Sequence, residues 1–465
     1  MSNSTPEQLR FPPIDGLSIR ADFKGGALST DFGPMLLRGV DQQIGLTEHL
    51  SRAFDDRRHA SYTDHPLSDL MAQRIFQIAC GYEDGNDANH LRTDPLFKLG
   101  VGRKPLDHDN HLASASTFSR LENAATIRDI YRLAQVFVDQ FIASYDQPPK
   151  VIVLDMDHSE DQTHGQQELS FYNHHYRSHC YLPLFVFEGL SGKFICAALR
   201  PGKRPKGAEN AMIIKRILKR LRTVWPDTHI ILRGDGHFSN PELMQLALDD
   251  ANTDFIFGMT GNAVLSRLAR PYLDAVHQLH EQRCSYARQH RQGEPSRTRT
   301  YHEVEYAAQS WPQAFRVIHK AEVMTLGENA RFVVTSLDLP SPECVYRDLY
   351  CARGQDENYI KNMKNDLACD RTSDHAFLAN HLRLYFSCAA YALHHALRTE
   401  TLRHTELANA QPGTIMLKLF KLAVRVVQYK DRVRLHLPSH CPVKSLLHKI
   451  TEILFLIRPP ARGAP

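Results

Sequence analysis

The hydrophobic and polar positions of the first third of the chain repeat with the period of an α-helix. Apolar residues recur every three or four positions in LSDLMAQRIFQIACGY and again in IRDIYRLAQVFVDQFIASY. The run YDQPPK then interrupts this pattern with two adjacent prolines, which a helix interior does not tolerate. We therefore expect residues 1–147 to form a helical N-terminal domain. Its segment SASTFSRLENAATIRDIYRL begins with cap residues and carries Arg120, which fits half of a DNA-binding helix-turn-helix as well as it fits an ordinary helical bundle.

Short runs of β-branched and aromatic residues follow. The runs KVIVLDMDHS, CYLPLFVFEG and GKFICAALRPG predict three strands, of which the last two form a hairpin. A helix in AENAMIIKRILKRLRTVW, a strand in HIILRGDGH, a helix in PELMQLALDD and a strand in TDFIFGM come next. Because the later strands alternate with helices, residues 148–261 predict an α/β domain whose mixed sheet contains parallel neighbours.

The pattern changes again after this domain. Residues 262–330 contain a charged helical segment, a basic loop and short strand-like runs, so we expect a β-rich insertion. Residues 331–397 return to the α/β core with a helix over residues 349–373, and residues 398–465 form a C-terminal segment. No repeat or low-complexity tract is present.

Composition and charge narrow the class of protein. The chain has 465 residues, of which 42% are hydrophobic and 23% charged, as in ordinary folded proteins. The N-terminus lacks a basic start followed by an apolar run, and apolar runs such as ILFLI are too short to span a bilayer. We therefore expect a cytoplasmic protein without a membrane partner. Nine cysteines without any C-x-x-C pair indicate small core residues rather than a zinc site or a disulfide framework.

The net charge of +4 is distributed unevenly along the chain. From Arg398 onward, twelve Lys and Arg residues stand against four Asp and Glu residues, which gives this segment about +8 and the remainder about −4. Such a segment is either a phosphate-binding surface or a solvated basic face.

Carboxylates fall at the ends of the predicted core strands. Asp155 and Asp157 lie two residues apart on the first strand and so face the same side of the sheet. Asp235 follows the fourth strand, at the carboxyl end where open α/β sheets bind ligands. Glu357 comes from the later helix. Converging carboxylates predict a divalent cation, and Mg²⁺ prefers such oxygen ligands.

The later helix has an unusual face. At 100° per residue, its stripe of polar side chains spans only about 60°, opposite a stripe of apolar ones. The polar stripe is Tyr350, Arg353, Glu357 and Lys364, and the apolar side holds Ala352, Ile360, Met363 and Leu367. An i, i+4 ion pair on a solvated helix is the alternative interpretation of Arg353 and Glu357.

The spacing Tyr350-x₂-Arg353-x₃-Glu357-x₆-Lys364 resembles the Y-R-E-K signature of DDE transposases from bacterial insertion sequences. LDMDHSEDQTHGQQ resembles the first-aspartate motif of this group, RGDGHFS resembles its second, and DRTS after the helix is also similar. The insertion sequence 1380 family is the nearest in pattern, over nearly the whole chain. The resemblance implies a ribonuclease-H-like core with a β-rich insertion between the second aspartate and the glutamate.

The resemblance also implies an activity: a transposase that cleaves transposon ends and joins them to target DNA by two-metal phosphoryl transfer. The catalytic and metal-binding residues would be Asp157, Asp235 and Glu357, with Asp155 as the competing first aspartate. Two Mg²⁺ ions, replaceable by Mn²⁺, would be the cofactors. The partners would be the terminal inverted repeats, the target DNA and a second copy of the chain in a synaptic homodimer. A catalytically silent DNA-binding protein and a structure-specific nuclease on the same fold are the alternatives.

Further residues are candidates for DNA contact. The resemblance assigns Tyr350, Arg353 and Lys364 to the DNA strand near the scissile phosphate. Arg200, Lys203 and Arg204 lie in LRPGKRPKGAEN at a predicted helix start, where backbone N–H groups favour phosphate.

Two other features have alternative interpretations. The histidines of NHHYRSHC lead into a strand without an identifiable further ligand, so we interpret them as exposed side chains beside the acidic site rather than a zinc site. Trp311 in the insertion is either a core residue or a platform for a displaced base.

Overall fold

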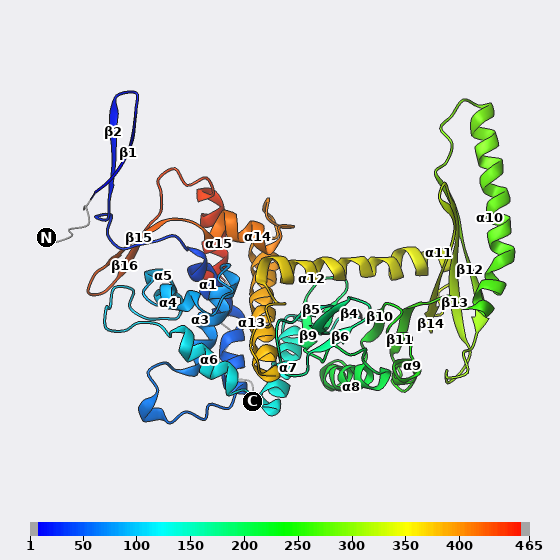
Figure 1. The fold of residues 1–465 in the computed structure, drawn as a ribbon, viewed down its shortest axis with the longest axis horizontal. Helices are drawn as coiled ribbons and strands as arrows, with labels where there is room; N and C mark the ends of the chain where they lie inside the picture. The colour runs from blue at the N-terminus through cyan, green and yellow to red at the C-terminus, as the bar shows by residue number, and fades with distance from the viewer. Residues whose placement is uncertain (1–7, 457–465) are drawn as a thin grey trace. The chain divides into compact units, whose positions relative to one another are not determined.

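The computed structural model describes residues 8–456, which divide into two compact units (Figure 1). The terminal unit comprises the described residues up to Ala125, Asp366–Ala368, and the described chain from Ala389 onward. The central unit comprises Thr126–Asn365 and Cys369–Cys388. No helix among the described residues has both the length and the apolar character needed to cross a membrane.

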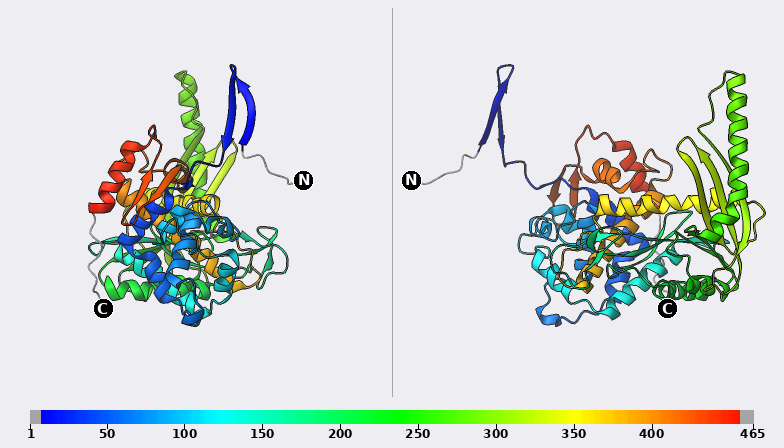
Figure 2. Two further views of the ribbon diagram at one scale, coloured as in Figure 1. Left: turned by 90° about the vertical axis from the view of Figure 1, so that its left-hand side faces the viewer. Right: turned by 45° about the vertical axis from the view of Figure 1, so that its right-hand side comes forward.

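The terminal unit is mainly helical. Its N-terminal part contains β1 (Gln8–Ile14), β2 (Leu17–Asp22), β3 (Leu28–Ser29), α1 (Gly33–Ile44), α2 (Leu46–Ala53), a 3₁₀ turn (Ala60–Tyr62), α3 (Leu67–Ala79), α4 (Asp87–Leu91), α5 (Pro95–Gly100) and α6 (Ala115–Asn123). Its C-terminal part contains a π-helical turn (Leu397–Thr401), α14 (Pro412–Ile415), a second π-helical turn (Met416–Phe420), β15 (Val424–Gln428), β16 (Val433–His436) and α15 (Lys444–Leu456). The β1–β2 hairpin extends away from the helices of its own unit (Figure 2).

The C-terminal segment is joined to the N-terminal helices by specific contacts. Strand β15 pairs with β3 in a three-stranded sheet. Lys421 Nζ donates to Asp31 Oδ1 at 2.7 Å, and the Tyr82 hydroxyl donates to Asp31 Oδ2 at 2.7 Å. Asp31 is buried, so this pairing provides the partners that a buried carboxylate requires. Residues from both ends of the chain therefore build one folded unit.

The central unit is built on an eight-stranded sheet with the order β12-β13-β14-β11-β10-β4-β8-β9. Its strands are β4 (Val151–His158), β8 (Leu184–Glu188), β9 (Phe194–Ala198), β10 (His229–Gly234), β11 (Thr253–Met259), β12 (Arg297–Tyr306), β13 (Phe315–Met324) and β14 (Gly327–Thr335). Strand β10 is parallel to both β4 and β11, whereas β8 is antiparallel to β4. This mixed order is that of a ribonuclease-H-like core, which confirms the predicted fold class.

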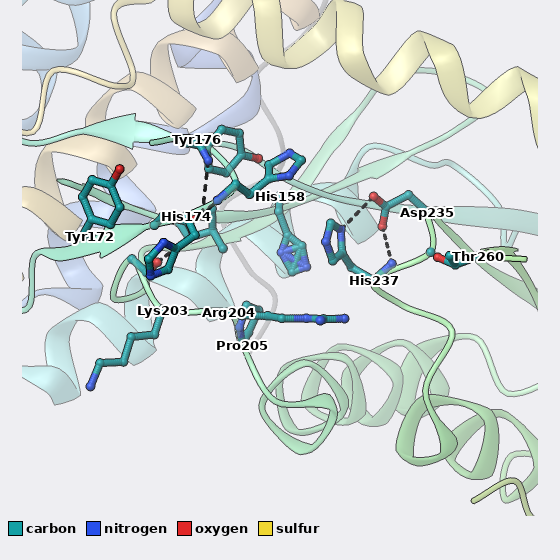
Figure 3. Close-up of a pocket in the computed structure, with 15 residues that line it drawn as sticks. His158, Tyr172, His174, Tyr176, Lys203, Arg204, Pro205, Asp235, His237 and Thr260 are labelled. Carbon is teal, nitrogen blue, oxygen red and sulfur yellow. Dashed lines mark hydrogen bonds and ion pairs between the residues drawn. The ribbon is translucent and has the colours of Figure 1, made fainter. Parts of the chain in front are cut away.

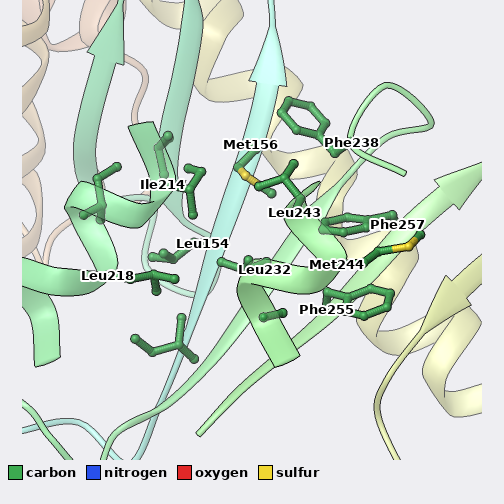
Figure 4. Close-up of a cluster of buried hydrophobic side chains, with 14 of the residues drawn as sticks. Leu154, Met156, Ile214, Leu218, Leu232, Phe238, Leu243, Met244, Phe255 and Phe257 are labelled. Carbon is green, nitrogen blue, oxygen red and sulfur yellow. The ribbon is translucent and has the colours of Figure 1, made fainter. Parts of the chain in front are cut away.

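One face of this sheet carries the main hydrophobic core (Figure 4). Leu154 and Met156 of β4 point into it and pack with side chains of α8 (Gly207–Val224) and α9 (Pro241–Leu248). Val153 belongs to a smaller cluster with Ile231, Val345 and other apolar residues. Because strand side chains alternate between faces, Asp155 and Asp157 share the face of Val153 and not that of the main core.

The predicted insertion continues the sheet instead of forming a separate body. Strand β14 pairs antiparallel with β11, and β12–β14 extend the sheet outward from there, with α10 (Ala263–Gln289) packed along β12 and β13 (Figures 1 and 2). Trp311 is half-buried against the main core, with its ring centroid 5.3 Å from that of Tyr306 and 5.8 Å from that of Phe315. These contacts favour the core interpretation of Trp311.

The glutamate helix is less regular than the sequence predicts. After α11 (Pro342–Cys344), the chain forms a π-helical segment (Val345–Tyr350), a 3₁₀ turn (Cys351–Arg353) and then α12 (Gly354–Leu367). Ile360, Met363 and Leu367 are buried, as the apolar stripe predicts, whereas Ala352 of the same stripe is only half-buried. The changes of helix type shift the rotation per residue, so a uniform 100° does not describe the stretch that contains Tyr350 and Arg353.

The remaining elements of the central unit surround the sheet. They are α7 (Ile127–Ala143), β5 (Asp161–Gln162), β6 (Phe171–Asn173), β7 (Ser178–Tyr181) and α13 (Phe377–Ala396), the last of which runs on into the residues of the terminal unit. Strands β5, β7 and β6 form a small separate sheet directly after β4. These three short strands connect β4, which bears Asp155 and Asp157, to β8, the next strand of the large sheet in sequence.

Candidate active site

Asp155 is the buried member of the two aspartates on β4. Its carboxylate forms a bidentate ion pair with the Arg233 guanidinium, in which the Nη2–Oδ2 distance is 2.5 Å. Both side chains are at most 1% exposed. Arg233 stands opposite Asp155 on the neighbouring strand β10 and also donates to the Leu349 carbonyl oxygen at 2.5 Å. The pair therefore joins β4 and β10 to the segment that leads to the glutamate helix.

Asp157 lies at the carboxyl end of the same strand and is connected to the glutamate helix. Arg353 Nη1 donates to Asp157 Oδ2 at 3.3 Å, and Arg353 Nη2 donates to Glu357 Oε1 at 3.4 Å. The Asp157 side chain is 14% exposed and that of Glu357 52%. Arg353 thus bridges the two carboxylates.

Burial raises the pKa of Asp157 to about 6. The Arg353 charge opposes this shift, while the negative charges of Asp235 and Glu357 add to it. The charges of the other two predicted catalytic carboxylates therefore reach Asp157.

Asp235 directly follows β10 and is held by the turn after it. The His237 backbone N–H donates to Asp235 Oδ1 at 2.9 Å, and His237 Nδ1 lies 3.0 Å from Asp235 Oδ2. Burial alone would raise the pKa of Asp235, but the hydrogen bonds and charge of His237 lower it overall. The same contact raises the pKa of His237. Asp235 is therefore the more readily ionised of the two strand-end aspartates.

Asp356 is a fourth carboxylate in this region. Its side chain is fully buried, and neither oxygen has a hydrogen-bond partner among the described residues. Burial raises its pKa far above the ordinary range, and the negative charges of Asp155 and Asp157 act in the same direction. Asp356 directly precedes Glu357 in the chain, so this buried carboxyl lies next to the proposed site, and its environment disfavours the charged form.

Lys364 points away from the bridging arginine. Its Nζ donates to the Glu160 carbonyl oxygen and lies 3.7 Å from Asp161 Oδ1 and 4.0 Å from Asp370 Oδ2. Asp161 is fully buried, and burial raises its pKa to about 8 although the lysine charge opposes the shift. The positive end of Lys364 is thus held beside the loop after β4.

The three basic candidates before α8 occupy different environments. Arg200 is buried, and its guanidinium donates to the Leu182 carbonyl oxygen at 3.1 Å and to Asn210 Oδ1 at 2.5 Å, with Nη2 2.7 Å from His158 Nδ1. Each of its side-chain nitrogens has a partner within the protein, so Arg200 supports His158, and its predicted contact with DNA phosphate would require these hydrogen bonds to open. Lys203 and Arg204 are exposed.

Tyr350 completes the predicted polar stripe. Its hydroxyl lies so close to Gly258 that a Cβ on this glycine would clash with it. Burial raises the pKa of Tyr350, as does the negative charge of Asp235. Tyr350 and Arg353 are therefore directed towards the two strand-end aspartates, whereas Lys364 is directed towards Asp161.

The donor chemistry of the site suits a hard divalent cation, because all of the candidate ligands are carboxylate oxygens. Among residues 8–456, however, no three Asp, Glu, His or Cys side chains stand close enough together to hold one ion. The Arg353 guanidinium lies between Asp157 and Glu357 and supplies the positive charge that these carboxylates require. Ligation by all three would therefore require Arg353 to move.

The sequence model of the family described as Transposase DDE domain group 1 matches residues 11–459. This match spans nearly the whole chain. The chain belongs to this DDE transposase family. The acidic residues at the ends of β4 and β10 and on α12 lie within the matched range.

Comparison with other proteins adds little detail to this assignment. No curated protein matches the transposase chain in sequence. Among solved structures, a cryo-EM structure of a piggyBac transposase synaptic complex with hairpin DNA is similar, with a TM-score of 0.43 and 11% identity over 93% of this chain and 83% of that one.

Several residues around the candidate site are not evident in the sequence pattern. Arg233 and Asp161 form ion pairs with residues distant in sequence, and Asp356 is buried near the charges of Asp155 and Asp157. Gln167 of the HGQQ segment is a further example, since its Nε2 donates to the carbonyl oxygens of Thr372 and Asp374, the latter at 2.7 Å. The similarity of HGQQ and DRTS to family motifs was the available signal, and the structure gives it a physical meaning: the two segments hold each other.

Proposed function

We propose that the chain is a DNA transposase of the insertion sequence 1380 type, which cleaves transposon ends and joins them to target DNA. The observation that carries this proposal is the link from Asp157 through Arg353 to Glu357, with Asp235 directly after the adjacent strand, in a chain of the DDE transposase family. The Y-R-E-K spacing supports the finer family assignment.

Asp157, Asp235 and Glu357 are the residues proposed to hold two Mg²⁺ ions, with Mn²⁺ as a substitute. Such ions, when bound, stabilise the charge of an in-line displacement at phosphorus. Asp157 is preferred to Asp155 as the first ligand because Asp155 already has a fully buried bidentate partner. If Asp155 turned to a metal ion instead, Arg233 would be left as a buried charge without its carboxylate partner, which would cost free energy.

The chain's own side chains contribute binding and orientation. Arg353 offers a guanidinium for a backbone phosphate, and Tyr350 stands beside Asp235. Lys203 and Arg204 provide further exposed cations on the same unit. We also propose that the N-terminal helices and the basic C-terminal segment contact DNA, and that two copies act together on the two transposon ends.

The test is cleavage of a DNA that carries the native element ends, in Mg²⁺, by the full chain and its Glu357→Gln variant. We expect the wild-type chain to nick the DNA at the ends, and the variant to bind the ends without cutting because an amide carries no charge for a cation. Glu281→Gln, which changes an exposed glutamate on α10, is the matched control.

Each alternative predicts a different result in this assay. A chain that binds the ends but never cuts would be a silent DNA-binding protein. Cleavage of branched DNA without regard to the element ends would indicate a structure-specific nuclease. Equal cleavage by wild type and Glu357→Gln would remove Glu357 from the proposed catalytic set.

A further inference from the structure

A cavity of about 710 Å³ lies beside Asp235 in the central unit (Figure 3). It is lined by His158, by residues 172–176 of the β6–β7 hairpin, by the loop residues 202–205 and by the turn after β10. This volume lies within the range of small-ligand pockets and is far too small for a DNA duplex. The cavity is thus large enough for one nucleotide, and it lies directly beside a predicted catalytic carboxylate.

The cavity wall is built by specific local contacts. Asn173 Oδ1 accepts from the backbone N–H of His175 at 3.0 Å, and Asn173 Nδ2 donates to the Gly202 carbonyl oxygen at 2.9 Å. A Cβ at Gly202 would lie 2.8 Å from the Phe171 carbonyl oxygen and still closer to that of Cys180, so only glycine allows the loop to approach the hairpin. Arg177 takes a left-handed conformation, with φ of 58°, where the hairpin turns. The hairpin and the loop are therefore fixed to each other.

The aromatic rings of two tyrosines line this cavity. Tyr172 is 48% exposed and forms edge contacts with the rings of His174 and His179. Tyr176 is half-buried; burial raises its pKa to about 12, and the negative charges of Asp157 and Asp235 raise it further. Tyr176 therefore lies between the histidine-rich turn and the carboxylates.

Arg204 adds an exposed positive charge to the lining. Within residues 8–456 it has no hydrogen bond and no ion pair, and its charge acts on nearby His237. Figure 3 shows its side chain extended beneath His158 and His237. Aromatic rings beside a free guanidinium are the chemistry that binds an unpaired base together with its phosphate.

The other aromatic candidate for a displaced base is already engaged. Trp311 packs against Tyr306, Phe315 and the main core, and it does not line this cavity.

We propose that this cavity binds one unpaired nucleotide of the DNA strand next to the scissile phosphate, with its base stacked on Tyr176 and its phosphate held by Arg204. This inference rests on the proposed function, because it takes the carboxylates beside the cavity as the cleavage site. The binding step itself needs neither metal nor cleavage.

The experiment measures binding of the full chain, in EDTA, to two duplexes that carry the native element end. In one duplex the terminal nucleotide is paired; in the other it is an unpaired 2-aminopurine, whose fluorescence is quenched by stacking. We expect the wild-type chain to bind the unpaired end at least about tenfold more tightly and to quench its fluorescence. Tyr176→Ala should abolish both the preference and the quenching, whereas Tyr176→Phe should retain them.

Matched variants separate ring and charge effects. Arg204→Ala should weaken binding of the unpaired end by about threefold or more and reduce its salt dependence, as expected for a lost phosphate contact. Tyr286→Ala, at an exposed tyrosine of α10, and Lys215→Ala, on the outer side of α8, should change neither value. Thermal melting identifies any variant that loses its fold. If Tyr176→Ala is such a variant, Tyr176→Phe tests the ring instead, since it should keep both the preference for the unpaired end and the quenching.

Two outcomes would overturn the inference: equal wild-type affinity for paired and unpaired ends, or equal losses on both DNAs in Tyr176→Ala. Failure of the proposed function has a different signature. A chain that prefers and quenches the unpaired end but never cleaves supports the cavity and contradicts the transposase activity. A chain that cleaves native ends without this preference contradicts the cavity alone.

Discussion

Asp155 and Asp157 lie two residues apart on strand β4, and each is paired with an arginine from another element. The two pairs differ in burial and in geometry. Asp155 and Arg233 form a bidentate pair, with side chains at most 1% exposed. Asp157 and Arg353 make a single contact at 3.3 Å, with side chains 14% and 18% exposed. The first arginine comes from the adjacent strand, whereas the second comes from a 3₁₀ turn before the glutamate helix and also contacts Glu357.

The difference separates a structural pair from an adaptable one. A buried pair with matched geometry cannot be opened without leaving an unpaired charge in the interior. The contact of Arg353 with Asp157 is longer and partly exposed, so breaking it costs less than opening the buried pair, and our proposal requires Asp157 and Glu357 to exchange this partner for a metal ion. The same residue types thus hold the sheet together at one position and form a candidate active site at the next.

The largest expected effect is on catalysis, in Asp157→Asn. We expect DNA end cleavage to fall by about 100- to 1,000-fold or more, the scale for losing one group that stabilises transition-state charge. Thermal stability should be unchanged or slightly higher, because burial already disfavours the Asp157 charge. Asp227→Asn, at an exposed aspartate of the same unit, serves as the control in both assays. A fully active Asp157→Asn variant would reverse the assignment of the two pairs.

The next effect is on stability, in Asp155→Asn. Removing one partner of a buried ion pair should lower the free energy of unfolding by about 3–5 kcal/mol, measured by urea denaturation. The double variant Asp155→Leu, Arg233→Met should recover much of this loss because it leaves no unpaired charge. A stable but inactive Asp155→Asn protein would instead make Asp155 the first catalytic carboxylate.

Asp161 provides an intermediate case, because it is fully buried while its partner Lys364 is partly exposed. Burial raises the pKa of Asp161 to about 8, above its value in an unfolded chain. The folded protein therefore keeps this proton between about pH 4 and pH 8 while the unfolded chain releases it, so this group makes the unfolding free energy fall as pH rises.

The variant Asp161→Asn has no such proton to lose. Relative to wild type, its free energy of unfolding should increase across that pH window by at least about 1.4 kcal/mol, the equivalent of one pKa unit. Urea denaturation at several pH values measures the difference. If the difference in unfolding free energy between the variant and wild type were constant with pH, Asp161 would be charged throughout. It would then pair with Lys364 as Asp155 pairs with Arg233.

The smallest effect is expected from Lys364→Ala. Its Nζ already lies beside Asp161 and the Glu160 carbonyl oxygen, so it can give only part of its charge to DNA. We expect less than a tenfold loss of DNA affinity and a salt slope smaller by about 0.9, as for one phosphate contact. Lys361→Ala, exposed on the same helix, is the control. An affinity loss that does not depend on salt would indicate a purely structural lysine.

Much of the central fold was predictable from local pattern. The β-branched runs, the helix in AENAMIIKRILKRLRTVW and the strand before Asp235 appear where the sequence predicts them, since each depends on the periodicity of its own residues. The mixed sheet with parallel neighbours was also predicted, and the parallel pairing of β4 with β10 agrees with it. Six of the nine cysteines are buried, as their scattered spacing predicts.

The details of the site were less accessible, for physical reasons. Arg200 is a residue type that often binds phosphate, but its side chain is buried against Leu182 and Asn210. No local sequence pattern connects these residues to Arg200. The π-helical and 3₁₀ turns before α12 likewise depend on tertiary packing, and they alter the helical stripe that a regular helix would give.

The sequence by itself determined the residue types of the site and the faces on which they stand: Asp155 and Asp157 on one side of a strand, Asp235 at a strand end, Glu357 on a helix. Those features follow from chain geometry over a few residues. Only the tertiary structure decided which aspartate is closed in by Arg233 and which is left beside Arg353, because that choice depends on side chains far apart in sequence. Burial and pairing are properties of the packed chain, and they separate two otherwise identical carboxylates.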